Sequence, residues 1–344
     1  MRVRSKRLPP PSLWSVRSST ERARSCSPIL IVCILWWRFR TLRCDLSGKI
    51  KLTKSLCMVT GCSFKLFMFQ FVVGRQQNRI YADLIKTELH IKIASWNVNS
   101  LRSRLDQVTT WLKTREPDVL LLQELKSAEF NDEAFKNLGY ECAAVTQKAY
   151  NGVATLSRHP METISTTLAG DSVDSHARFL EVMVSGIRIA NIYLPNGNPV
   201  GTDKFVYKLA WMNRLKQQMI GWQEDAVPTV IGGDFNVIPE DIDCHKPSSW
   251  MHDALFQPEP RAMYRSLLDL GYVDAFRSLH PGEGGKFTYW DYFRRSFENN
   301  RGIRIDHFLL SLTLASRLEG CEIDKGPRAQ EKPSDHTPIV VTLR

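Results

Sequence analysis

The sequence predicts an α/β fold in which helices cover the outside of β-sheets, and three observations from residue 91 onward support it. Short apolar runs alternate with longer stretches in which apolar residues recur every three or four positions. Pro and Gly separate these runs. Apolar residues make up 43% of the chain and charged residues 24%, as in a globular protein. Alternating strands and helices of this kind pack as layers around a shared core.

The predicted strands are short and mostly apolar. They span residues 91–96, 119–122, 152–156, 179–184, 187–193, 229–231, 303–310 and 339–343. Pro195 and Gly197 are expected to stop the fifth strand, because both residues favour turns. Gly232 and Gly233 are expected to close the sixth strand, just before Asp234.

The predicted helices follow apolar residues at helical spacing. An amphipathic helix is expected over residues 101–114, carrying Leu101, Leu105, Val108 and Leu112 and ended by Pro117. The longest expected helix carries Phe205, Leu209, Met212, Leu215 and Met219. A shorter helix is expected over about residues 261–270. These helices and strands belong to one domain, residues 90–344.

Charge divides the chain into two unequal parts. The formal net charge is +10, yet residues 1–89 hold 17 Lys and Arg against 4 Asp and Glu, a net of +13. Residues 90–344 hold 29 basic against 32 acidic residues, a net of −3. If the main domain binds nucleic acid, it must do so through a local basic patch and a metal ion rather than through its overall charge.

Residues 1–89 differ from the rest in composition. They contain clustered Arg and Ser, five of the eight cysteines, and an apolar run over residues 28–37 that is too short to span a bilayer. An Arg- and Ser-rich leader with few acidic residues is one interpretation, an organellar transit peptide. The preferred interpretation is a basic extension that is disordered or absent from the mature protein, with translation beginning near His90. A zinc site is disfavoured because the cysteines lack paired spacing.

The remaining three cysteines, Cys142, Cys244 and Cys321, are scattered, which favours a reducing compartment with free thiols. We therefore expect a cytoplasmic protein that associates with the nucleoid when it acts on DNA. Organellar targeting by residues 1–89 is the alternative.

Polar side chains able to bind a metal or a phosphate end or interrupt strand after strand. The set comprises Asn97, Asn99, Glu124, Tyr193, Asn196, Asp234, Asn236, Asp306, Asp335 and His336. Each has a plainer explanation when taken alone. The Asp234–Asn236 stretch behind two glycines is also a turn signal, and Asp335 is also a helix N-cap type. Strand ends are nevertheless where open α/β sheets build their sites, and the repetition favours one shared site.

The residue types indicate phosphodiester chemistry. Carboxylate and amide oxygens without cysteine suit a hard cation, Mg²⁺ with Mn²⁺ as the alternative. A His beside a carboxylate can be held in one tautomer and polarise a phosphate oxygen. A Tyr hydroxyl or an amide NH₂ can donate to phosphate without adding negative charge, and an Asp can orient the attacking water.

Six motifs resemble the exonuclease III family of abasic-site endonucleases, within the endonuclease/exonuclease/phosphatase superfamily. They start at Ser95 (SWNVN), Leu122 (LQELK), Ile192 (IYLPNG), Gly233 (GDFN), Asn300 (NRGIRID) and Lys332 (KPSDH). All six occur in the family's order over roughly residues 91–344. The last two are the motifs more specific to the abasic-site branch.

The resemblance implies a four-layer sandwich, in which two packed β-sheets are flanked by helices. It implies a metal site formed by Asn97, Glu124, Asp234, Asn236, Asp335 and His336. It implies a catalytic set of Tyr193, Asp234, Asn236, Asp306 and His336, in which Asp306 holds the catalytic His. It implies DNA or phosphate contacts by Asn99, Arg178, Asn196, Tyr289, Ile303 and Ile305, the last two with Tyr289 forming an apolar pocket for a flipped-out abasic sugar.

The activity implied by the resemblance is Mg²⁺-dependent DNA repair on double-stranded DNA by a monomer. It comprises incision 5′ to an abasic site, 3′→5′ exodeoxyribonuclease action and 3′-phosphatase action. One alternative keeps the chemistry on another phosphate ester, such as RNA, an inositol phosphate or a lipid headgroup. A second alternative is an inactive DNA-binding module, which is disfavoured because every expected chemical position is filled.

Overall fold

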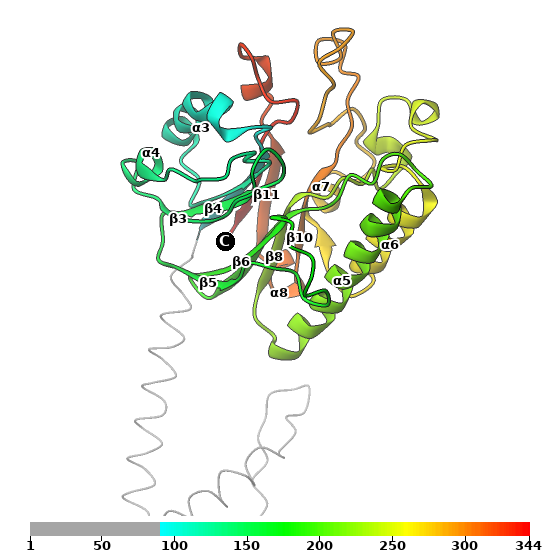
Figure 1. The fold of residues 1–344 in the computed structure, drawn as a ribbon. Helices are drawn as coiled ribbons and strands as arrows, with labels where there is room; N and C mark the ends of the chain where they lie inside the picture. Colours follow the sequence, from blue (N-terminus) through cyan, green and yellow to red (C-terminus); the bar gives the residue numbers. More distant parts are fainter. Residues whose placement is uncertain (1–89) are drawn as a thin grey trace, which may run out of the picture. The chain divides into compact units, whose positions relative to one another are not determined.

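The computed structural model describes residues 90–344, and the interpretations of residues 1–89 lie outside the described residues. The described chain forms two six-stranded mixed sheets (Figure 1). The first has the order β11 (Leu318–Ile323), β12 (Ile339–Leu343), β1 (Ile91–Asn97), β2 (Val119–Gln123), β4 (Val153–Ser157), β3 (Glu141–Val145). The second has the order β5 (Met161–Ser165), β6 (Phe179–Val184), β7 (Ile187–Tyr193), β8 (Thr229–Asp234), β10 (Asp306–Leu310), β9 (Val273–Asp274).

Helices cover the outer faces of both sheets. In Figure 1, α3 (Leu101–Arg115) and α4 (Glu133–Lys136) lie beside the first sheet, and α5 (Asp203–Asp225) and α6 (Pro258–Leu268) lie beside the second. The short helix α7 (Ala275–Leu279) contacts β9, β10 and β11, and the short helix α8 (Leu312–Ala315) contacts β10. Single turns of 3₁₀ helix lie at η2 (Asp241–Asp243), η3 (Pro247–Ser249) and η4 (Pro327–Ala329). The four-layer sandwich is therefore confirmed.

Three apolar layers hold the sandwich together. Residues from the facing sides of the two sheets, including Leu121, Ile189 and Phe308, form the central core. Trp211 and Met219 of α5 pack on the outer face of the second sheet. Trp111 of α3 packs on the outer face of the first sheet. Burial of this apolar surface is the main term that favours the fold.

Each sheet contains one strand–helix–strand unit with parallel strands. Helix α3 connects β1 to β2, and helix α5 connects β7 to β8. In these parallel pairs Asn97 lies opposite Gln123, and Tyr193 lies opposite Asp234. The carboxyl ends of all four strands therefore lie at one edge of the sandwich, which is where such sheets place their sites.

Two predicted strand limits were wrong, both near the site. Strand β8 does not close at Gly232 but runs through Gly233 to Asp234, pairing with β7 and β10. A Cβ at Gly232 would lie 2.4 Å from the Phe308 ring, and a Cβ at Gly233 would lie 1.9 Å from the Ile192 carbonyl oxygen. These glycines allow close packing rather than a turn.

The strand expected over residues 303–310 begins only at Asp306. Before it, Ile303 forms isolated bridges to Cys244 and Tyr289, because the chain here joins the loops above the sheet. The predicted helix at residues 261–270 lies instead at Pro258–Leu268, with proline in its first turn.

Within residues 90–344, no helix combines the length and apolar character needed to cross a membrane.

Candidate active site

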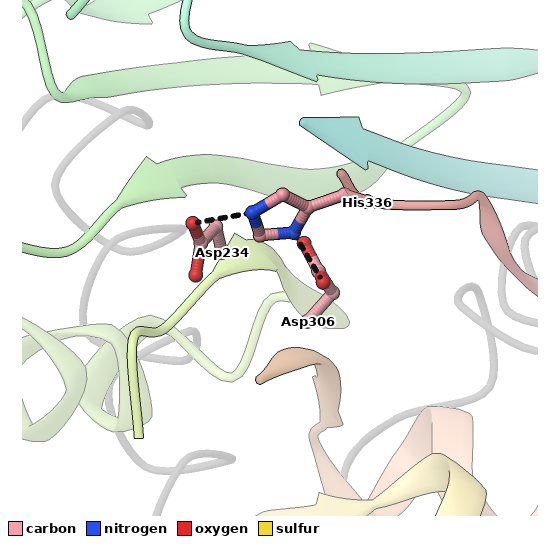
Figure 2. A group of neighbouring side chains, drawn as sticks. All are labelled: Asp234, Asp306 and His336. Atoms are coloured by element: carbon pink, nitrogen blue, oxygen red, sulfur yellow. Dashed lines mark hydrogen bonds and ion pairs between the residues drawn. The ribbon is translucent and has the colours of Figure 1, made fainter. Parts of the chain in front are cut away.

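The centre of the site is an imidazole between two carboxylates (Figure 2). His336 Nδ1 lies 2.8 Å from Asp306 Oδ2, and His336 Nε2 lies 3.8 Å from Asp234 Oδ2. Asp306 begins β10 and Asp234 ends β8, and these two residues are directly paired in the antiparallel ladder. His336 precedes β12 of the other sheet. The site therefore joins the two sheets, and its three members are almost fully buried.

Burial and charge set the protonation of this centre. Burial alone would lower the pKa of His336, but the carboxylates of Asp306 and Asp234 outweigh it and raise the pKa to about 10. The pKa of Asp234 is raised to about 7, because burial and the Asp306 carboxylate together outweigh the lowering effect of the His336 imidazolium. At neutral pH the imidazole is therefore protonated and can donate from Nε2.

A second cluster surrounds Glu124, the residue after β2. The Asn97 amide donates from Nδ2 to Glu124 Oε1 at 2.9 Å and to Asp234 Oδ2 at 3.0 Å. The Tyr193 hydroxyl donates to Glu124 Oε1 at 2.8 Å, and Lys126 Nζ lies 2.6 Å from Glu124 Oε2. Burial raises the pKa of Glu124, but Lys126 and Asn97 more than offset this effect and leave the pKa lowered. Glu124 is therefore an ionised carboxylate with fixed geometry.

The Tyr193 side chain is held as a hydrogen-bond donor. Burial, followed by the carboxylates of Glu124 and Asp234, raises its pKa well above 10. The Arg178 guanidinium lies over the Tyr193 ring, 4.6 Å from the centroid, and its Nη1 donates to the Tyr193 carbonyl at 3.2 Å. Arg178 thus reaches the site through Tyr193.

Two asparagine side chains lie next to Asp234. The backbone N–H of Asn236 donates to Asp234 Oδ1 at 2.8 Å, and the Asn236 amide donates to the Leu194 carbonyl at 2.9 Å. Asn196 Nδ2 donates to Asn236 Oδ1 at 3.1 Å. Asn236 has φ 47°, in the left-handed region that asparagine tolerates better than most residues. The loops after β7 and β8 are therefore tied together at the site.

Asp335 and Asn99 form the side of the site nearest α3. Asn99 Nδ2 donates to Asp335 Oδ1 at 3.0 Å, and Lys126 Nζ donates to Asn99 Oδ1 at 2.6 Å. Ser334 Oγ donates to the Asn97 carbonyl at 2.8 Å, which fixes the turn that carries Asp335. Asp335 makes no direct contact with Glu124, and Lys126 with Asn99 connects them.

The donor set fits a hard divalent cation. Glu124, Asp335 and Asp234 offer carboxylate oxygens, and none of these groups is a thiol. The amide oxygens of Asn97 and Asn236 accept from Asn99 and Asn196, so they would join the ion only by exchanging these hydrogen bonds. Asp234, Asp306 and His336 also have ligand atoms within 4.8 Å of one another. Because Asp306 already holds His336 Nδ1, Glu124 and its neighbours fit the ion better than this trio does.

A cavity of about 730 Å³ opens beside this centre. Tyr289 lies on its wall, and the Tyr289 ring also contacts His336 edge-on, with the centroids 5.0 Å apart. Ile303 and Ile305 are fully buried and pack behind Tyr289 with Cys244 and Leu255. Tyr289 thus faces the cavity, whereas the two isoleucines support its wall from behind.

Four residues of the site were not singled out from the sequence. Lys126 ends the LQELK motif, and Ser334 lies within the KPSDH motif. Both residues would have been predicted if every polar residue of the two motifs had been counted as part of the site. Lys208 lies on the inward face of α5, where its neighbours are apolar. Arg304, from NRGIRID, is buried and pairs with Asp243 at 2.7 Å and Asp274 at 2.9 Å, so its position holds the loops together.

Known proteins are similar to this chain over most of the described residues. The model of the Endonuclease/Exonuclease/phosphatase family matches residues 94–336. Exodeoxyribonuclease III of Haemophilus influenzae is 36% identical over 262 residues, which cover 72% of this chain and 98% of that protein. The DNA-(apurinic or apyrimidinic site) endonuclease of Dictyostelium discoideum is 29% identical over 260 residues, covering 74% of this chain and 71% of that protein.

Solved structures give the same result. An AP endonuclease from Archaeoglobus fulgidus superposes with a TM-score of 0.71 at 37% identity, covering 74% of this chain and 99% of that one. A 3′ phosphatase from Neisseria bound to a product DNA hairpin has a TM-score of 0.71 at 36% identity, with the same coverage. The chain belongs to the endonuclease/exonuclease/phosphatase family of hydrolases. Within that family it belongs to the exonuclease III type of abasic-site endonucleases.

Proposed function

We propose that this protein is a DNA-repair nuclease acting on duplex DNA with Mg²⁺ as its cofactor. It hydrolyses the phosphodiester 5′ to an abasic site, and it removes nucleotides and phosphate groups from 3′ ends. The observation that carries the proposal is the imidazole of His336 held between two carboxylates, next to the Glu124 cluster. The names of the relatives support the DNA substrate.

The proposed chemistry divides the roles among the buried residues. Asp234, with its pKa raised by burial, orients the attacking water and takes its proton. His336 donates from Nε2 to a non-bridging phosphate oxygen, while Asp306 holds its Nδ1. Tyr193 and Asn236 are the donors on the phosphate side and add no negative charge, the Tyr193 hydroxyl turning from Glu124 to the phosphate.

A divalent cation bound by Glu124, Asn97 and Asp335 would neutralise charge on the phosphate and stabilise the leaving oxygen. Lys126, which pairs with one oxygen of Glu124, keeps this carboxylate ionised and oriented. This assignment leaves Asp234 free to act on water. The ionised Glu124 supports a hard cation as the cofactor, with Mn²⁺ as the alternative to Mg²⁺.

Unpaired cations beside the centre support binding of a DNA strand. The cavity is lined by Lys246, Arg294 and Arg301, and none of the three forms an ion pair with a carboxylate in residues 90–344. Exposed cations that face an open cavity suit backbone phosphates. This local patch explains how a domain with net charge −3 can hold a polyanion.

We propose a monomer that acts in the cytoplasm, at the nucleoid.

The test uses the full-length protein on an end-labelled duplex with one abasic site, with Mg²⁺ and with EDTA. The proposal expects Mg²⁺-dependent incision 5′ to the lesion, and release of phosphate from a 3′-phosphorylated duplex. An inositol phosphate and a single-stranded RNA, assayed in parallel, test the alternative substrates. Hydrolysis of either of these, without incision of the duplex, overturns the DNA proposal but keeps the chemistry.

A further inference from the structure

We infer that Lys208 is a positioning residue for phosphate-ester hydrolysis, because it fixes the two backbone segments that carry Asn196 and Asn236. The inference rests on the proposed roles of these two asparagines. Lys208 Nζ donates to the Asn236 carbonyl at 2.6 Å and to the Asn196 carbonyl at 3.0 Å. The same two residues are joined above by their side chains, from Asn196 Nδ2 to Asn236 Oδ1.

Lys208 occupies a position of helix α5 at which packing against the second sheet favours an apolar residue. Helix α5 turns an inward stripe toward the second sheet, formed by Lys208, Trp211, Met212, Leu215, Met219 and Trp222. Lys208 is the charged member of this stripe, and its relative exposure is 0%. Burying an ammonium group is unfavourable unless a specific interaction offsets the loss of hydration.

No carboxylate in residues 90–344 forms an ion pair with Lys208, so its two carbonyl acceptors provide the direct contacts, and the more distant carboxylates of Asp253 and Asp234 also favour the charged form. Burial lowers the pKa of Lys208 to about 7. The two hydrogen bonds require only two N–H groups, and both the amine and the ammonium form supply them. The positioning role therefore holds in either protonation state.

The loop above Lys208 is fitted closely to it. A Cβ at Gly197 would lie 2.6 Å from Lys208 Cδ, and Gly197 has φ +87°, so this position requires glycine. Asn236 is itself held at φ 47°. A non-glycine residue keeps such a backbone only where its surroundings hold it, and the Lys208 bond to its carbonyl is one such constraint. Loss of Lys208 is expected to release both asparagines from their phosphate-facing positions.

The loop also connects this lysine to the cavity. Asn198 Nδ2 donates to Asn196 Oδ1 at 2.9 Å and to Asp253 Oδ1 at 3.0 Å, and Asp253 lines the cavity. Asn198 Oδ1 accepts from the Ala254 backbone at 2.9 Å. Lys208 therefore supports a loop that is hydrogen-bonded through Asn198 to Asp253, a residue of the cavity wall.

The experiment compares Lys208→Met with Lys216→Met, a matched change on the same helix at a partly exposed position away from the site. For Lys208→Met we expect kcat to fall about 100-fold, as for small misplacements of catalytic groups. Since the DNA-binding cations are intact, KM should stay within about threefold. Lys216→Met should leave both constants unchanged. A Lys208→Met kcat within twofold of the wild type would overturn the inference.

A double-mutant cycle separates positioning from general support of the fold. In an Asn196→Ala/Asn236→Ala background, Lys208→Met should add less than about a threefold further loss, because the two side chains it positions are gone. A full, multiplicative loss would mean that Lys208 acts elsewhere. If Lys208→Met does not fold, Lys208→Gln, which keeps one amide donor, is measured in the same cycle. It should then show a smaller loss with the same non-additivity.

The inference and the proposed function can fail separately. If the wild type does not cut abasic duplex DNA, the wild type, Lys208→Met and Lys216→Met are assayed on bis-p-nitrophenyl phosphate, a generic phosphodiester. A Lys208 effect on that substrate would retain the positioning role although the DNA proposal had failed. Normal incision by both the wild type and Lys208→Met would overturn the positioning role alone.

Discussion

Asp306 and His336 come from different sheets and are joined by a 2.8 Å hydrogen bond in which both side chains are buried. Asp306 Oδ1, the other oxygen of the carboxylate, has no partner. The Asp306 carboxylate is the largest of the influences that raise the pKa of His336 against the opposing effect of burial. The charge on the imidazole therefore depends more on this contact across the two sheets than on the other carboxylates, Asp234 and Asp335.

Asp306→Asn should remove that charge while preserving the shape of the side chain. We expect the pKa of His336 to fall from about 10, and kcat to drop roughly 100-fold at neutral pH, in the range typical of lost acid–base assistance. NMR titration of the His336 ring checks the first part, and single-turnover incision checks the second. An unchanged kcat would remove His336 from its role as a charged donor.

Asp234→Asn tests the water-activating role. The amide keeps an oxygen to accept from the Asn236 backbone but cannot take a proton. We expect a loss in kcat of about 1,000-fold with little change in KM, because the DNA contacts lie elsewhere. Asp106→Asn, at an exposed position of helix α3, is the control for loss of a carboxylate. Cleavage that survives Asp234→Asn would show that another group activates the water.

Glu124→Ala tests the assignment of the metal site. Removing this ionised carboxylate should shift the half-saturating Mg²⁺ concentration upward by about tenfold or more, as for loss of a ligand contact. Glu129→Ala, an exposed acid in the loop that follows β2, should leave the titration unchanged. The measurement is the incision rate against Mg²⁺ concentration. Equal titrations for both variants would place the ion away from Glu124.

Truncation to residues 90–344 tests the interpretation of the basic extension. Every proposed catalytic, metal and DNA contact lies in this part of the chain. We expect the truncated protein to incise an abasic duplex at the full-length rate at moderate salt. A lower rate that is recovered at low salt would show that the basic segment contributes to DNA binding by charge.

Much of the site could be predicted from the sequence because its polar residues follow strand ends. Tyr193 and Asp234 lie opposite each other in the β7–β8 ladder, as parallel strand ends must. The contact between Asp306 and His336 could be reached only through the family resemblance. These residues belong to different sheets, and no local pattern specifies how two sheets face each other.

The sequence alone does not show where tertiary packing overrides a local turn or strand signal. Gly232 and Gly233 are turn signals that serve instead as close-contact positions within β8. Strand β5 was missed because it lies at a sheet edge and most of it is exposed, so it lacks the apolar run of a central strand. Lys208 was not predicted because its hydrogen-bond acceptors belong to loops, and the sequence does not specify where these loops lie relative to α5.

His307 makes a separate prediction about stability against pH. It is fully buried, with Nε2 3.0 Å from the Val237 carbonyl and Nδ1 2.9 Å from Arg304 Nη1. Burial, and then the Arg304 guanidinium, lower its pKa from 6.5 to about 4. Between these values the unfolded chain binds a proton that the folded chain does not, so stability falls as pH falls from 6.5 toward 4. The loss across the window approaches about 3 kcal/mol.

The measurement is urea unfolding at pH 7.5 and pH 5 for the wild type and His307→Gln. Glutamine can donate to Val237 but cannot titrate, so the variant should lose less stability between the two pH values than the wild type does. Comparing the two proteins removes the contributions of other groups, such as His336. The raised pKa of His336 stabilises the folded state in full below pH 6.5, and this stabilisation is lost as pH rises toward 10. Equal losses in the two proteins would show that His307 does not titrate in the unfolding equilibrium over this range.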